Sequence, residues 1–234
     1  LAAVIMEPCR WNDPEPGFLE FIRDRAHACG ALVIYDEITI GWRLTFGGAH
    51  LKLGISPDIA IFAKALGNGY PIGAVIGARA AMEGAHRSFI SSTYWTEGIG
   101  PVAALATLRK MEQVKAHEHA AQIGTAVSAV WKERAAEHGL RIQTGDGYPC
   151  LAHFKFAYDN SETLRTLYTQ LMLERGFLGG VSIYPTTAHT TDVVSLYDAA
   201  VSDVFSILAQ AIRQDCVDSL LRGPVAHSGF RRLN

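Results

Sequence analysis

The sequence has few cysteines, no long apolar run and almost no net charge, and each of these absences excludes a class of protein. Its four cysteines lie far apart and form no CxxC pair, which excludes a disulfide-built scaffold and indicates a reducing compartment, the cytoplasm. No apolar stretch approaches the roughly 18 residues that a membrane-spanning helix needs. No basic leader typical of a secretory signal stands at the start. We therefore expect no membrane partner.

An excess of charge of one sign is also lacking. The 21 Lys and Arg residues nearly balance the 23 Asp and Glu residues, for a net charge of −2. Proteins that bind nucleic acid carry a basic face, so we expect small molecules as partners and no nucleic acid. We expect no metal site either, because His117 and His119 lie two apart in a helical stretch and point to different faces.

Apolar residues, in contrast, are abundant. Hydrophobic residues make up 49% of the 234 positions and charged residues 19%, which is typical of a globular protein with a large core. At about 150 residues per domain, this length corresponds to about one and a half domains. Because Leu1 also falls inside a strand-like stretch, we expect the chain to lack the N-terminal part of a longer protein.

The first half alternates short apolar runs with stretches of helical spacing. This alternation predicts an α/β fold, with helices on both faces of a sheet. Buried strands are expected at Ala2–Met6, Ala31–Tyr35 and Ile59–Ala63. Between the first two strands, apolar residues from Phe18 onward recur at helical spacing up to a glycine cap at Gly30.

One further strand is expected to run against the others. Ile72–Gly77 follows the preceding strand after only a Gly-rich turn at 67–71. This turn is too short for a helical crossover, so the two strands should be antiparallel. The sheet is therefore predicted to be mixed and mostly parallel.

The second half predicts two long helices in series, from Pro101 to about His138, and then a small α+β unit. That unit is expected to contain a strand and two helices, at Leu151–Phe156, Glu162–Arg175 and Leu196–Arg213. We place a domain boundary near residue 112. Residues 1–112 are then the C-terminal half of a large domain, and 113–234 are a linking helix and a small C-terminal domain.

Two charged residues follow neighbouring strands directly. Asp36 comes after one strand and Lys64 after the next, and in open α/β sheets the carboxyl ends of the strands border the ligand crevice. The small neighbours Ala63 and Ala65 leave room for a flat ligand and are expected to desolvate the amine of Lys64, as in a Schiff-base lysine. The alternative is that Asp36 caps a helix and Lys64 is a solvated surface residue.

Several short motifs accompany this pair. They include Ala3-Val4-Ile5-Met6-Glu7-Pro8, Asp36-Glu37-Ile38 with Gly41-Trp42-Arg43, Gly47-Gly48-Ala49, Ala63-Lys64 through Gly69, Pro71-Ile72-Gly73-Ala74 and Ser92-Thr93-Tyr94. Together they resemble the class III aminotransferases of the pyridoxal-phosphate fold type I group, including the glutamate-1-semialdehyde aminomutase-like branch. The resemblance covers about residues 2–112. In the second half its clearest element is Arg175-Gly176-Phe177, followed by Ala188-His189-Thr190 before the last helix.

The resemblance implies a cofactor, pyridoxal 5′-phosphate, and a role for each site residue. Lys64 would form the Schiff base and move the proton between the substrate carbon and the cofactor. Asp36 would keep the pyridine nitrogen protonated, so that the ring can act as an electron sink. Thr93, with Ser92 beside it, would reach the cofactor phosphate of the other subunit. The resemblance therefore also implies a homodimer with shared active sites and an amine or amino-acid substrate.

Two departures from the family pattern concern the substrate. Many members have glutamine at the position of Thr39, and many have an arginine for the substrate carboxylate in the small domain, where this chain has Val181–Pro185. Arg43 is the cation nearest to the Asp36 motif and either faces the cleft or caps the sheet edge. His189 matches the family but can equally be a hydrogen-bonded structural histidine.

The predicted function is amino-group transfer, and three alternatives stay open. Within the family, an aminomutase would use the same lysine and carboxylate. A truncated chain could be a non-catalytic fragment or interaction subunit. The stretch Leu32–Asp36 followed by Glu37 also fits a Walker B strand of a nucleotide hydrolase. No Gly-x-x-x-x-Gly-Lys-Ser/Thr loop occurs in the chain, and Lys64 between small residues has no role in such an enzyme.

Overall fold

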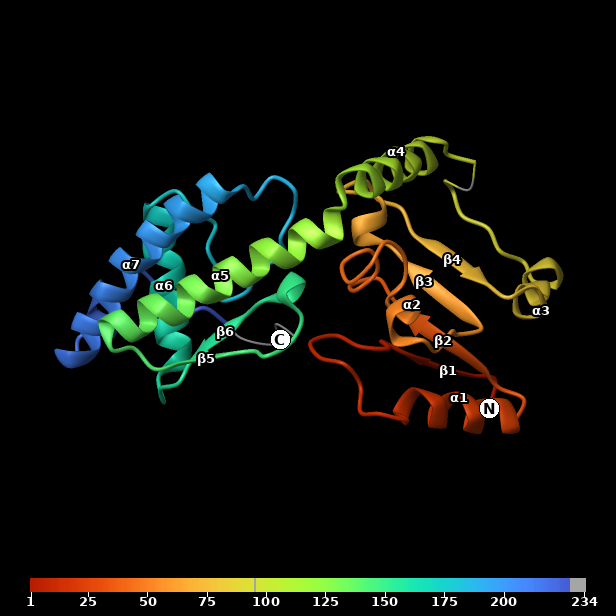
Figure 1. Ribbon diagram of the computed structural model, residues 1–234, viewed down its shortest axis with the longest axis horizontal. Helices are drawn as coiled ribbons and strands as arrows, with labels where there is room; N and C mark the ends of the chain where they lie inside the picture. Colours follow the sequence, from red (N-terminus) through yellow and green to blue (C-terminus); the bar gives the residue numbers. More distant parts are fainter. Residues whose placement is uncertain (95, 228–234) are drawn as a thin grey trace. The chain divides into compact units, whose positions relative to one another are not determined.

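The structure is a computed structural model and describes residues 1–94 and 96–227. The chain divides into two compact units after Ala121 (Figure 1). Residue 112, where the sequence analysis places a boundary, lies in helix α4 (Ile99–Val114), and the following helix α5 (Ala116–His138) crosses from the first unit into the second. The two consecutive helices predicted between Pro101 and His138 are confirmed.

The first unit is built on a four-stranded sheet with the order β1-β2-β3-β4. Its strands are β1 (Ala3–Met6), β2 (Leu32–Asp36), β3 (Ile59–Phe62) and β4 (Ala74–Gly77). The first three run parallel, and β4 is antiparallel to β3, as the short turn before it predicts. The mixed, mostly parallel sheet is therefore confirmed.

Short and long helices connect these strands. They are α1 (Phe18–Ala28), α2 (Ala49–Leu53), α3 (Arg79–Met82), α4 and two 3₁₀ helices, η1 (Lys64–Leu66) and η2 (Glu83–Arg87). The predicted helix after Phe18 is confirmed as α1, and Gly30 beyond its end has φ 71°, a left-handed conformation that glycine adopts without strain.

Two helices bury one face of the sheet. Helix α1 covers Val33 and Tyr35 of β2, and α4 covers Ala60 and Phe62 of β3. Tyr35 and Ala60 are neighbours in the parallel register. Neighbouring residues point to the same side of a sheet, so the two helices lie on a common face and form one apolar layer above it.

The opposite face of the sheet is apolar and partly exposed. Ile5 is 61% exposed and Val75 54%. The register shows which residues share this face. Ile5 pairs with Ile34 on the neighbouring strand. Asp36 pairs with Ile61, and Ile61 pairs in turn with Val75. Asp36 is therefore a carboxylate on the open face, at the edge where β2 ends.

The second unit packs helices on a two-stranded sheet. Its elements are α5, β5 (Ile142–Thr144), β6 (Phe154–Phe156), α6 (Ser161–Glu174), α7 (Thr191–Arg213) and the 3₁₀ helices η3 (Pro149–Leu151) and η4 (Asp218–Leu220). Phe154, Phe156, Tyr168 and Phe205 are all buried and stack edge to face around one centre. This aromatic cluster joins α6 and α7 to the strands.

Three details of this unit differ from the prediction. The strand predicted at Leu151–Phe156 is the 3₁₀ helix η3 followed by the shorter strand β6, and β5 was not predicted. The last helix begins at Thr191 rather than Leu196, because the Thr190 hydroxyl accepts a hydrogen bond from the N–H of Val193 and caps it. The predicted helix at Glu162–Arg175 is confirmed as α6.

None of the helices in the described ranges is both long and apolar enough to cross a lipid bilayer.

Candidate active site

Lys64 lies where β3 ends and η1 begins. Its φ of 45° is left-handed, a conformation that costs a non-glycine residue about 1 kcal/mol. The backbone N–H groups of Gly67 and Asn68 donate to its carbonyl, each at 3.2 Å. The tight turn therefore holds the backbone of Lys64 in a strained conformation, which is a common property of functional residues.

The amine of Lys64 has a side-chain partner from another strand end. Its Nζ donates to Oγ1 of Thr39, 2.9 Å away. Thr39 is buried, with 7% of its surface exposed, and its hydroxyl lies at the end of the turn that follows β2. In the sequence, Thr39 stands out only as a departure from the family pattern, and no local signal there indicates this contact.

Lys64 as a whole is exposed, whereas its small neighbours predict a desolvated amine. The structure gives the reason. Ala63 and Ala65 are too small to cover the lysine stem, and the open face of the sheet beside them carries exposed side chains such as Ile5 and Val75. The amine is therefore accessible to a ligand from this side.

Asp36 is the last residue of β2, and its neighbour across the parallel register is Ile61, three residues before Lys64. Its Oδ1 accepts a hydrogen bond from the N–H of Ile38 at 3.0 Å. The carboxylate and the amine thus stand at the carboxyl ends of adjacent parallel strands, as the sequence analysis predicts for a ligand crevice.

Glu37 is directed away from this crevice. It is 1% exposed, and one carboxylate oxygen accepts from the N–H of Ala49. The other oxygen lies 3.2 Å from the N–H of His50 and 2.5 Å from its Nδ1. Because both oxygens are occupied by α2, Glu37 cannot activate a water molecule, and this argues against the nucleotide hydrolase alternative.

Arg43 supports the turn after β2. Its Nε donates to the backbone carbonyl of Thr39 at 2.8 Å, and the N–H of Gly41 donates to the carbonyl of Glu37 at 2.8 Å. A Cβ at Gly41 would come within 2.8 Å of that same carbonyl oxygen, so glycine permits the close turn. The sequence left the role of Arg43 open. In the structure, Arg43 binds the backbone of Thr39, and the hydroxyl of Thr39 in turn binds the amine of Lys64.

Ser92 and Thr93 lie apart from this arrangement, in the segment between η2 and α4. Both are exposed. The same segment carries Phe89 and Tyr94, with 96% and 78% of their surface exposed. Within a single copy of the chain, Lys64 contacts Thr39, and Asp36 ends the strand next to the one that Lys64 follows. Ser92 and Thr93 are not part of this arrangement and are exposed.

His189 belongs to the second unit and stabilises the turn before α7. Its Nδ1 accepts from the N–H of Thr186 at 3.0 Å and lies 3.2 Å from the hydroxyl of the same residue. The ring also lines a largely apolar cavity of about 220 Å³ that includes Phe177, Val194 and Tyr197. The hydrogen bonds favour the structural role that the sequence analysis weighed for His189.

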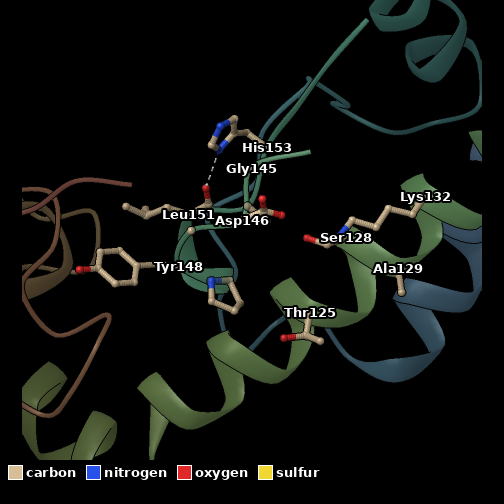
Figure 2. A pocket seen from close by; sticks show the side chains of 12 residues that line it. Thr125, Ser128, Ala129, Lys132, Gly145, Asp146, Tyr148, Leu151 and His153 are labelled. Carbon is tan, nitrogen blue, oxygen red and sulfur yellow. Dashed lines mark hydrogen bonds between the residues drawn. The ribbon is translucent and has the colours of Figure 1, made fainter. Parts of the chain in front are cut away.

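A second cavity of the same unit, of about 360 Å³, lies between α5 and the segment that joins β5 to β6 (Figure 2). Thr125, Ser128 and Lys132 project from α5, and Asp146 and His153 come from the joining segment. The Nδ1 of His153 lies 3.3 Å from the carbonyl oxygen of Leu151. The lining mixes the cation of Lys132 with the anion of Asp146.

Metal chemistry has no candidate site within residues 1–94 and 96–227, where no group of three or more His, Cys, Asp or Glu residues could hold an ion.

A protein-family model described as "Aminotransferase class-III" matches residues 1–211, which include Asp36, Lys64, Ser92, Thr93 and His189. Among curated proteins, the chain is 34% identical over 170 residues to a 3-aminobutyryl-CoA aminotransferase of Cloacimonas acidaminovorans (strain Evry). That match covers 70% of this chain and 41% of the relative.

Solved structures with the same fold include a protein in its pyridoxal-phosphate internal aldimine form and an omega-transaminase. The pyridoxal-phosphate internal aldimine form of the FumI protein of Sphingopyxis sp. MTA144 superimposes with a TM-score of 0.85 at 24% identity, covering 94% of this chain and 55% of that one. An omega-transaminase of Sphaerobacter thermophilus gives a TM-score of 0.77 at 23% identity, with 89% and 52% covered. The chain thus spans about half the length of these proteins, and the fold class predicted from the sequence is confirmed.

Proposed function

Because this chain belongs to the class III aminotransferase family, we propose that it is part of a pyridoxal-phosphate-dependent enzyme that transfers amino groups, with Lys64 as the residue that binds the cofactor. The observation that supports this most directly is the position of Lys64 and Asp36 at the ends of adjacent parallel strands. The substrate is a small amine or amino acid.

The residues of the site fit a flat aromatic aldehyde with a ring nitrogen. Lys64 presents an exposed primary amine, and Asp36 presents a carboxylate on the open sheet face beside it. Ala63 and Ala65 place no bulky side chain next to the amine. When bound, pyridoxal phosphate supplies an electron sink that stabilises a carbanion at the substrate carbon.

Each residue then has a defined task. The Nζ of Lys64 binds the aldehyde carbon and afterwards takes and returns the proton at the substrate carbon. The carboxylate of Asp36 holds a proton on the ring nitrogen, because an adjacent negative charge favours the protonated ring. The hydroxyls of Thr93 and Ser92 donate to the phosphate bound by a second subunit.

We propose a homodimer in which the second subunit covers the surface around α4. This helix exposes Ile99, Val102 and Leu105, by 59%, 66% and 54%, at spacings that place them on one side of a helix. Phe89 and Tyr94, in the segment before α4, are exposed as well. Exposed apolar side chains gathered on one side of a helix are typical of a protein interface, and Ser92 and Thr93 lie between Phe89 and Tyr94 in the segment that leads into this helix.

We also retain as proposals two assignments that the sequence suggested. Residues 1–112 are the C-terminal half of the large cofactor-binding domain, and 113–234 are the linking helix and small domain. The protein resides in the cytoplasm, which the four cysteine thiols support.

The test of the cofactor assignment is a trapping experiment on the full-length protein. The protein is incubated with pyridoxal phosphate, reduced with borohydride and digested, and the modified peptide is identified by mass. We expect the label on Lys64, and none on that peptide in a Lys64→Ala variant. Lys52, on the exposed side of α2, is the matched control position. Label at Lys52 instead of Lys64, or no label, would overturn the proposal.

An aminomutase is the second candidate, favoured by the motifs around Asp36 and Lys64. The two reactions differ in their need for an acceptor, since a mutase moves the amino group within one molecule. Turnover that strictly requires a keto acid excludes the mutase, and turnover without one excludes the aminotransferase.

A further inference from the structure

We propose that Thr39 is a positioning residue for Lys64, and that Arg43 acts through Thr39 in the same way. This inference rests on the proposed function, because it assigns a task within the same site. It concerns the free amine, before a carbonyl compound has reacted with it.

The contact between the two side chains joins residues that are far apart in the sequence. The Nζ of Lys64 lies 2.9 Å from the Oγ1 of Thr39, and the two residues follow adjacent strands. A lysine stem has four rotatable carbon–carbon bonds and therefore many rotamers. A single buried acceptor at its tip selects the rotamers that keep the amine at the strand ends.

Thr39 can do this because its own position is fixed. The Nε of Arg43 donates to its carbonyl at 2.8 Å. The turn that carries it is closed by the hydrogen bond from Gly41 to Glu37, and the carboxylate of Glu37 is buried against the start of α2. The hydroxyl is thus attached to a turn that is anchored at three points.

The other partner is fixed as well. The backbone of Lys64 is held in its left-handed conformation by the two N–H groups that donate to its carbonyl. With both ends anchored, the hydrogen bond between Nζ and Oγ1 leaves the lysine tip little freedom. Such preorganisation of a reacting group is a recognised source of rate enhancement.

A hydroxyl is also the right kind of partner for a nucleophilic amine. A neutral amine can donate one N–H to the hydroxyl oxygen and keep its lone pair for the carbonyl carbon. A carboxylate at the same place would favour the ammonium form, which has no lone pair. Thr39 therefore holds the amine without consuming the electron pair that the reaction needs.

In capture of an aldehyde, the lone pair of Nζ would bond to the aldehyde carbon, a carbon–nitrogen double bond would replace the carbon–oxygen double bond, and the oxygen would leave as water with the two protons of the neutral amine. The hydrogen bond to Thr39 is made again whenever the amine is released. The residue thus acts on the rate at which Lys64 captures the aldehyde and on its recapture.

The test compares three forms of the full-length protein: the unchanged protein, Thr39→Val and Thr39→Ser. Valine has nearly the shape of threonine but lacks the hydroxyl, and serine keeps the hydroxyl. Capture of pyridoxal phosphate at Lys64 is followed over time by borohydride quenching and peptide mass. We expect capture by Thr39→Val to be about fivefold to tenfold slower, as for the loss of one hydrogen bond, and capture by Thr39→Ser to stay within about twofold.

A further variant separates positioning from a general loss of folding. Arg43→Met leaves the Thr39 hydroxyl in place and keeps an unbranched side chain, but it has no N–H to donate to the carbonyl of Thr39, so we expect capture slowed by about twofold to fivefold. Labelling of Lys52 serves as the internal reference and should not change in any variant.

The outcomes distinguish this inference from the proposed function. If the unchanged protein captures no cofactor at Lys64, the proposed function fails and the role of Thr39 fails with it. If the unchanged protein captures the cofactor and Thr39→Val does so equally fast, only the role of Thr39 is overturned. It is overturned also if Thr39→Ser is as slow as Thr39→Val, because the effect would then be one of packing.

Discussion

The carboxylate of Glu37 and the imidazole of His50 form a buried pair, with Oε1 and Nδ1 2.5 Å apart. The side chain of Glu37 has no exposed surface and that of His50 is 16% exposed. The pair connects the turn after Asp36 to the first residues of α2. The turn that carries Thr39 is therefore linked to a residue eleven positions further along the chain, whose ring lies so close to Gly48 that a Cβ there would clash with it.

The first prediction concerns this pair. His50→Ala removes one hydrogen-bond donor from a buried carboxylate, and we expect the free energy of unfolding to fall by about 1–3 kcal/mol. Urea denaturation measures the change. His50→Gln, which can still donate a hydrogen bond, should lose less, and an equal loss in the two variants would contradict the role of the hydrogen bond.

The second prediction concerns the pH dependence of stability. Burial alone would raise the pKa of Asp58, but hydrogen bonds from the N–H of Val33 at 2.7 Å and from His27 at 2.8 Å outweigh it and hold the pKa below its ordinary value of 3.8. A carboxyl group whose pKa is lowered by folding stabilises the protein above its unfolded pKa. That stabilisation is lost as the pH falls through the folded pKa.

Asp58→Asn should therefore lower the urea midpoint at neutral pH. Below about pH 4, the range of an ordinary aspartate pKa, the urea midpoint of this variant should fall less steeply with decreasing pH than that of the unchanged protein. The exposed Asp159 provides a control, as Asp159→Asn should leave the acid decline in place. If the urea midpoint of Asp58→Asn falls with decreasing pH as steeply as that of the unchanged protein, groups other than Asp58 cause the loss of stability in acid.

The third prediction concerns an ion pair that joins α5 to α7. The guanidinium of Arg134 donates to both oxygens of Asp198, at 2.6 and 2.8 Å, and this hydrogen bonding lowers the pKa of Asp198. Because both side chains are about 30% exposed, water screens the attraction, and we expect Asp198→Asn to cost about 1 kcal/mol or less. Thermal unfolding at low and high salt checks this, since the effect should shrink as salt is added.

The fourth prediction concerns the hydroxyl of Tyr197 in the buried core of the second unit. It lies 2.8 Å from the Nε1 of Trp131 and 2.8 Å from the hydroxyl of Tyr168. Tyr197→Phe leaves both of these buried groups without this partner, so the free energy of unfolding should fall by about 1–3 kcal/mol.

Tyr35→Phe is the matched control for that variant. The hydroxyl of Tyr35 is buried and has no hydrogen-bond partner within residues 1–94 and 96–227, so its removal should change stability little or raise it. Equal losses in Tyr35→Phe and Tyr197→Phe would contradict the stabilising role of the hydrogen bonds of Tyr197.

Much of the local structure follows from the sequence alone. Apolar runs and helical spacing predict β1, α1, β2, β3 and the reversed strand β4, and all are present. The family resemblance predicted from the motifs is confirmed as well. The shorter elements β5 and η3 escape this reasoning, because a three-residue strand carries too little periodicity to be recognised without its partner strand.

The sequence by itself determined that Asp36 and Lys64 end neighbouring strands, because a strand's end is marked by its own residues and by those next to it. Only the tertiary structure decided that the amine of Lys64 is held by Thr39, that Arg43 fixes Thr39, and that Glu37 is withdrawn against α2. These contacts depend on the register between β2 and β3 and on the course of the turns after each strand. A register is set by the packing of the whole sheet against α1 and α4, so no local stretch of sequence contains it.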